Sequence, residues 1–138
     1  MLKLLIPIID RRGAREAARH GAFLFAERCV SEVEIVEVLE DLGHDRSVAF
    51  HSIGALRRLE KRVMQDALQQ TRAILEDAGV PYTWKRVFGP PERVIASFAE
   101  RSRADIVVLD ASGLGFVRKW SVLARLRRLT HTPVTLVQ

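Results

Sequence analysis

The chain has 138 residues, of which 48% are hydrophobic and 28% are charged, and its formal net charge is +5. This length and composition are typical of one globular domain, which we place at residues 1–138. No apolar run approaches the roughly 20 residues that span a bilayer, and the single cysteine, Cys29, cannot form an internal disulfide. We therefore expect a cytoplasmic protein with no membrane partner.

Apolar runs alternate with helical spacings along the chain. Leu2–Ile9 is almost wholly apolar, which is typical of a strand buried on both faces of a sheet. Helical spacing follows in Gly13–Cys29, and it predicts that Cys29 is a small core residue. The other predicted elements are a strand at Val33–Val38, a loop at Glu40–Ser52, a helix at Ile53–Ala78, a strand at Tyr82–Phe88, a helix from Pro91, a strand at Asp105–Leu109, a loop at Asp110–Trp120, a helix at Ser121–Thr130 and a strand at Pro133–Val137.

This alternation predicts an α/β fold with parallel strands and right-handed crossovers. An ordered set of sequence segments makes this fold prediction more specific. The segments are Leu4–Asp10, Gly79-Val80-Pro81, Gly89-Pro90-Pro91-Glu92, Ala104–Leu109 and Thr132–Val137. With these segments the whole chain resembles the universal stress protein family. The resemblance implies a doubly wound, five-stranded parallel sheet in the order 3-2-1-4-5, with helices on both faces. Ligands of such sheets bind at the carboxyl ends of the central strands, where the strand order reverses.

The family's ATP-binding members carry the loop Gly-x2-Gly-x9-Gly-Ser/Thr, whose glycines let backbone N–H groups approach phosphate closely. When the chain is aligned on Pro133, the three glycines of this pattern correspond to Asp110, Gly113 and Trp120. Its final Ser/Thr corresponds to Ser121. The loop is three residues shorter than the pattern, and two of its three glycines are replaced. We therefore predict weak or absent ATP binding. Trp120 is either a buried plug in the former phosphate site, which is the preferred interpretation, or an exposed anchor for a partner.

The resemblance also implies which residues could still contact a nucleotide. Asp10 matches the family's adenine-side aspartate, and Val38 matches the end of the second strand near the base. Around the shortened loop, a nucleotide or a smaller anion could be held by Ser112, Gly113, Gly115, Ser121 and Val122. Ser121 is also the expected N-terminal cap of the last helix. Asp10 with Asp110 could form a carboxylate pair, but aspartates at strand ends are common, so we predict no catalytic residue and no metal site.

The preferred function is a stress-response binding or regulatory protein that is not an enzyme and needs no cofactor beyond weakly bound ATP or AMP. One alternative is an adenine-nucleotide switch that retains ATP or AMP binding, and another is a nucleotide hydrolase-like α/β enzyme. The basic cluster from Arg118 to Arg128 could bind RNA, DNA or an anionic lipid, but a solvated helix surface is the simpler interpretation, and no nucleic acid partner is expected. We expect a homodimer, because the last strand is an uncharged sheet edge made of Val134, Thr135, Leu136 and Val137.

Overall fold

The computed structural model describes residues 1–10, 12–39 and 53–138, with side chains of the second helix described from residue 65 onward. The predicted loop Glu40–Ser52, which contains His44 and His51, lies outside these residues.

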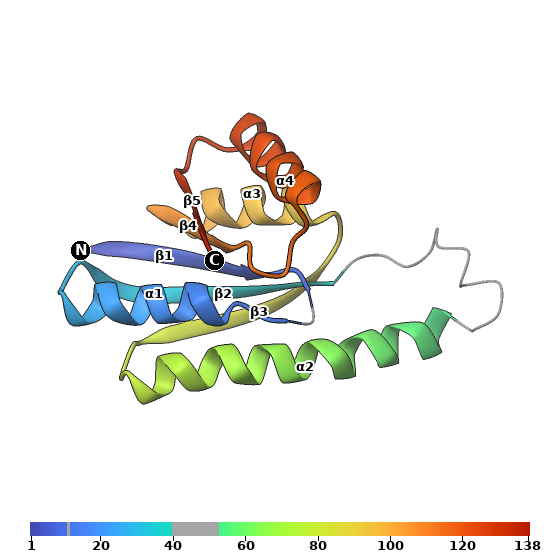
Figure 1. Cartoon of the computed structure of the whole chain (residues 1–138), viewed down its shortest axis with the longest axis horizontal. Helices are drawn as coiled ribbons and strands as arrows, with labels where there is room; N and C mark the ends of the chain where they lie inside the picture. Colours follow the sequence, from blue (N-terminus) through green and yellow to red (C-terminus); the bar gives the residue numbers. More distant parts are fainter. Residues whose placement is uncertain (11, 40–52) are drawn as a thin grey trace.

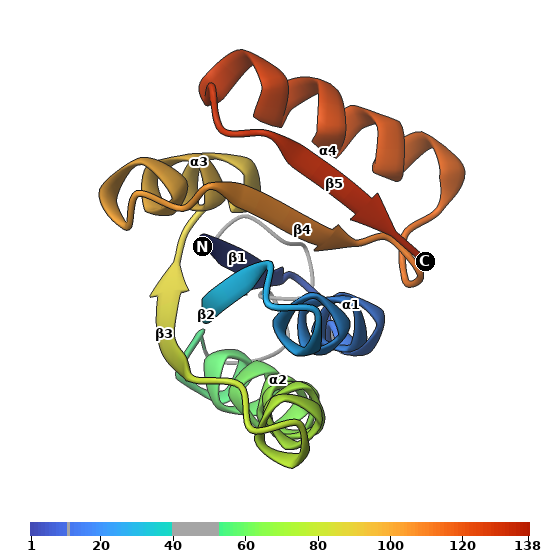
Figure 2. The same cartoon turned by 90° about the vertical axis from the view of Figure 1, so that its left-hand side faces the viewer.

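Five parallel strands and four helices alternate along the described chain. They are β1 (Leu2–Ile8), α1 (Arg15–Ala26), β2 (Val30–Leu39), α2 (Ile53–Asp77), β3 (Tyr82–Phe88), α3 (Pro91–Arg101), β4 (Ile106–Asp110), α4 (Phe116–Leu129) and β5 (Val134–Val137). The strands form one sheet in the order β3-β2-β1-β4-β5, which confirms the predicted fold class and strand order. Helices α1 and α2 lie on one face of the sheet, and α3 and α4 lie on the other (Figures 1 and 2).

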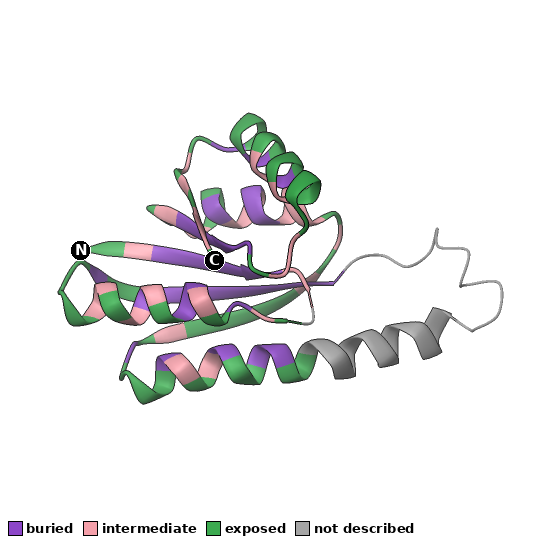
Figure 3. Cartoon of the chain, in the orientation of Figure 1, coloured by how far each residue is buried: buried purple, intermediate pink, exposed green. Residues whose placement is uncertain are grey.

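The core consists of two apolar layers, one on each face of the sheet. Strand β1 is buried from Leu4 to Ile8, and its side chains alternate between the layers. Leu4 and Ile6 pack in the layer under α1 and α2, whereas Leu5 packs in the layer under α3 and α4. Burial of each such side chain contributes about 1.5–3 kcal/mol. Figure 3 shows the contrast between the buried central strands and the mostly exposed surface of α4.

Helix α1 ends three residues before Cys29, and Cys29 is exposed. The prediction that this cysteine packs in the core was therefore wrong. Arg28 adopts the left-handed conformation with φ of 61°, and the Cys29 N–H donates to the Leu24 carbonyl at 2.9 Å. This arrangement ends a helix by satisfying its last carbonyls. No glycine marks the position, so the apolar spacing extended the predicted helix too far.

The two edges of the sheet differ in charge. Strand β3 forms one edge and carries Lys85 and Arg86, whereas β5 forms the other edge and has no charged residue. Charged side chains on an edge strand discourage pairing with another chain, so β5 is the edge left open to such pairing. No helix in the described part of the chain combines the length and apolar composition that crossing a membrane requires.

Candidate ligand site at the carboxyl ends of strands β1 and β4

Two short connections meet at the end of the sheet where its order reverses. The first follows β1 and contains Asp10, and the second follows β4 and contains Gly113. A Cβ atom placed on Gly113 would lie 2.4 Å from the Asp10 Oδ2 atom and 3.1 Å from the Arg12 Cδ atom. The β4–α4 connection therefore lies against the Asp10 side chain, and a larger residue at position 113 would have to displace that side chain.

Asp10 closes the turn that carries the chain from β1 into α1. Its Oδ1 atom accepts a hydrogen bond from the Arg12 N–H at 2.8 Å, and its carbonyl accepts one from the Gly13 N–H at 3.2 Å. Gly13 has a φ of 75°, and a Cβ atom on it would lie 2.9 Å from the Ala67 carbonyl oxygen. An aspartate that bonds the backbone two residues later stabilises a turn, so Asp10 has a structural role here.

Asp110 caps helix α1 from the end of strand β4. Its Oδ2 atom accepts hydrogen bonds from the Glu16 N–H at 2.8 Å and from the Ala17 N–H at 3.3 Å. Its Oδ1 atom accepts one from the Ser112 N–H at 3.0 Å and another from the Ser112 hydroxyl. The carboxylate is buried, and Ala14, the local N-cap residue, supplies no side-chain acceptor. Asp110 thus satisfies donors that a helix N-terminus leaves unpaired, and it complements the helix dipole.

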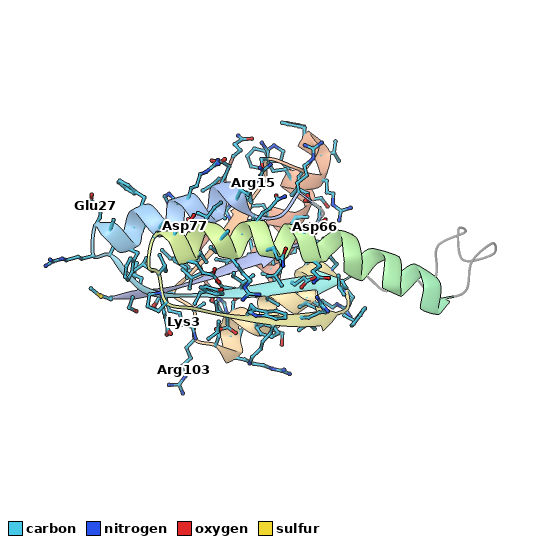
Figure 4. The ribbon with its side chains drawn as sticks, turned by 90° about the horizontal axis from the view of Figure 1, so that it is seen from below. Lys3, Arg15, Glu27, Asp66, Asp77 and Arg103 are labelled. Carbon is cyan, nitrogen blue, oxygen red and sulfur yellow. The ribbon has the colours of Figure 1, made fainter. Side chains whose placement is uncertain are left out.

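Two cationic side chains, those of Arg12 and Arg15, lie at the start of α1. Together with Glu16 and Ser112 they line an open hollow of about 230 Å³. Arg15 lies at the end of α1 that is nearer to α4 (Figure 4). Neither Arg12 nor Arg15 was among the residues predicted from the sequence. The signal that could have found them is the group of three arginines, Arg11, Arg12 and Arg15, that follows the first buried strand within a few residues.

Helix α4 begins at Phe116 and not at Ser121, about one and a half turns earlier than the sequence predicted. Its first residue is Phe116, its N-cap is Gly115, and the Lys119 N–H donates to the Gly115 carbonyl at 2.9 Å. Ser121 therefore lies inside the helix and is not its cap, so that prediction was wrong. Trp120 is 50% exposed, so the indole is no buried plug. The Leu114 N–H donates to the Ala111 carbonyl at 3.1 Å, so a tight turn joins β4 to α4 and the helix begins directly after it.

The structure brings together some of the seven predicted nucleotide contacts. Asp10, Ser112 and Gly113 gather at the two connections, and Gly115 is the N-cap of α4. Val38 and Val122 are buried in the apolar layer under α3 and α4, and Ser121 is exposed on the helix surface. Among the described residues, no three His, Cys, Asp or Glu side chains converge as a metal site would require.

An open parallel α/β sheet with its candidate site at the reversal point defines a class of proteins that hold small ligands at the strand ends. A family model described as the universal stress protein family matches residues 1–138. The chain belongs to this family.

Comparisons with individual proteins agree with this assignment. The universal stress protein MJ0531 of Methanocaldococcus jannaschii is 29% identical over 139 residues, which cover 99% of this chain and 81% of that protein. The solved structure of the hypothetical protein MJ0577 superposes with a TM-score of 0.76 at 22% identity, covering 98% of this chain and 94% of the other. A universal stress protein from Archaeoglobus fulgidus in complex with dAMP superposes with a TM-score of 0.70 at 17% identity, covering 100% and 98% of the two chains.

Proposed function

We propose that this chain is a cytoplasmic stress-response protein that acts by binding, as a homodimer, and that it lacks the triphosphate site of the family's ATP-binding members. The observation that carries the proposal is the early start of α4 at Phe116. In the ATP-binding pattern a flexible loop ends in Gly-Ser at the helix N-terminus. Here Trp120 and Ser121 occupy those two positions within the helix, so the Ser121 N–H belongs to the helical ladder.

Asp110 supports the same conclusion from the other side of the connection. It occupies the position of the pattern's first glycine, and its carboxylate is directed at the N–H groups that begin α1. A phosphate placed there would meet a buried negative charge instead of a free helix N-terminus, and the like charges would repel each other. The β4–α4 connection therefore lacks the glycine-rich backbone that the ATP-binding pattern has, and it carries a negative charge where a triphosphate would need a positive one.

The structure offers little support for an enzyme. Ser112 is the one serine of the β4–α4 connection, and its hydroxyl donates to Asp110. That carboxylate already accepts three backbone N–H groups, so it serves as a structural acceptor. An activated serine needs a base that is itself held by a third group. We infer that the domain binds its ligand without transforming it.

A second candidate is a switch that binds a mononucleotide. The relative from Archaeoglobus fulgidus holds dAMP, which has a single phosphate and makes fewer demands on the β4–α4 connection. Arg12 and Arg15 could pair with that phosphate, because they line the hollow beside Ser112. This candidate keeps Asp10 as its adenine-side residue.

Calorimetry separates the two candidates. We expect no measurable heat with Mg-ATP at micromolar protein concentration. A dissociation constant near 1 μM, equivalent to about −8 kcal/mol, would overturn the loss of the triphosphate site. Titration with AMP tests the second candidate, with Arg15→Gln as the variant that should weaken binding and Asp66→Asn, on the exposed surface of α2, as the control.

A further inference from the structure

Helix α4 presents exposed apolar side chains at its start. Phe116 is 74% exposed, Val117 is 80% exposed and Trp120 is 50% exposed. We call these three residues the α4 tip. The Phe116 and Trp120 rings contact each other edge to face, with centroids 6.3 Å apart and ring planes at 71°. Exposed apolar groups gathered in this way are typical of a binding surface.

The same helix is strongly cationic. It carries Arg118, Lys119, Arg125, Arg127 and Arg128, and no acidic residue occurs from residue 116 to residue 138. The Lys119 ammonium lies 5.8 Å from the centroid of the Trp120 ring. The partner of this surface must therefore combine negative charge with an apolar phase.

One face of α4 bears both features. Val122 and Leu126 pack against the sheet. Opposite them, helical spacing aligns exposed residues along the outer face: Val117, Trp120, Ser121, Ala124, Arg127 and Arg128. The apolar groups lie at the first turns of this face and the two arginines lie at its last turn. A surface that carries exposed apolar side chains at one end and arginines at the other suits a bilayer interface, where apolar groups enter the acyl boundary and cations meet the headgroup phosphates.

We propose that the outer face of α4 docks on an anionic lipid bilayer, with the α4 tip entering the interface and the arginines pairing with lipid phosphates. The proposal stands apart from the nucleotide site and departs from the sequence-based expectation of no membrane partner. That expectation came from the lack of an apolar run of about 20 residues, which argues against a membrane span but not against binding at the membrane surface.

Two other occupants fit the surface less well. A second copy of this chain would bring its own cationic helix against this one in a symmetric contact, and the like charges would repel. Single-stranded nucleic acid stacks its bases on parallel aromatic faces. The Phe116 and Trp120 rings are nearly perpendicular, and Val117 has no aromatic face to offer.

Vesicle sedimentation tests the proposal with the whole chain. We expect the protein to sediment with phosphatidylcholine vesicles that contain 30% phosphatidylglycerol and to remain in the supernatant with pure phosphatidylcholine vesicles. The double variant Phe116→Ser/Val117→Ser should reduce the partition coefficient about tenfold or more because it removes apolar area. Arg127→Gln should reduce it about fivefold, and added salt should act in the same direction.

A matched control comes from the other layer of the protein. Phe23 lies on α1 and is 60% exposed, so Phe23→Ser removes a similar aromatic from the opposite face and should leave binding unchanged. Thermal melting by circular dichroism verifies that each variant is folded. Equal binding to neutral vesicles, absence of binding to anionic ones, or full binding by the Phe116→Ser/Val117→Ser variant would overturn the proposal. Tighter binding to single-stranded RNA than to vesicles would also overturn it, in favour of a nucleic acid partner.

Discussion

The carboxylate of Asp110, at the end of β4, accepts a hydrogen bond from the backbone N–H of Glu16, at the start of α1, at 2.8 Å. The two residues are 94 positions apart in the chain. This bond links the start of α1 to the end of β4. It also places a negative charge at the N-terminus of α1, where such a charge is stabilising. It also uses the donors that would otherwise be available to a bound anion.

Replacement of Asp110 by alanine should lower the free energy of unfolding by about 1–2 kcal/mol, because it removes the cap of α1. Urea unfolding followed by circular dichroism measures this change. Asp66→Ala is the control, since Asp66 lies on the exposed surface of α2 (Figure 4), and it should change the stability by less than about 0.5 kcal/mol. Equal stability of Asp110→Ala and the parent chain would contradict the capping role.

Gly113 and Gly115 form a matched pair of glycines. A Cβ atom on Gly113 meets Asp10 at 2.4 Å, whereas one on Gly115 meets no atom within 4 Å. We expect Gly113→Ala to displace the Asp10 side chain from the Arg12 N–H and to destabilise the protein by about 1 kcal/mol, the value of one hydrogen bond. Gly115→Ala should lower the free energy of unfolding by only about 0.3 kcal/mol. The two melting temperatures compare the sites directly, and a larger loss at Gly115 would contradict this geometry.

The proposed homodimer can be tested at the β5 edge. The Pro133 and Val137 carbonyls accept hydrogen bonds from the Val107 and Ala111 N–H groups, respectively. Alternation along the strand therefore directs the Leu136 N–H away from β4, to the open edge. We expect Leu136→Pro to convert a dimer into a monomer, measured by light scattering on a sizing column at micromolar concentration.

Leu136→Ala is the control for this experiment because it shortens the same side chain and keeps the N–H donor. It should remain dimeric. A parent chain that elutes as a monomer of 15.6 kDa would refute the dimer itself. Monomers for both variants would assign the contact to the leucine side chain instead of the edge donors.

An ion pair between a buried glutamate of β2 and an exposed arginine of β3 joins these two strands. Glu37 is fully buried, and one of its carboxylate oxygens lies 3.2 Å from the Arg86 Nε atom. Its other oxygen, Oε1, has no hydrogen-bond partner among the described residues. Removal of one member of such a pair leaves an uncompensated charge, so Arg86→Ala should destabilise the protein by about 3 kcal/mol. Arg103→Ala, at an exposed turn, should have a far smaller effect in the same urea titration.

Local patterns in the sequence were sufficient for the order and type of the elements. Continuous apolar runs predicted buried strands such as β1, and the Gly89-Pro90-Pro91 turn marked the start of α3, because these signals depend on neighbouring residues alone. The order of the strands came from the resemblance to the family. The predicted location of a ligand site at the ends of β1 and β4 then followed from that order.

The tertiary structure alone decided what Asp110, Trp120 and Cys29 do. Asp110 was placed in a phosphate loop by alignment, but its partners are N–H groups of a helix distant in sequence, which only folding brings near. Trp120 was expected to fill a cavity, but α4 begins about one and a half turns earlier than predicted and leaves the indole exposed to solvent. Cys29 lies beyond the end of α1 because Arg28 adopts a left-handed conformation, which ends the helix. Hydrophobic spacing records which residues can be buried, whereas helix ends and long-range caps depend on where the rest of the chain lies.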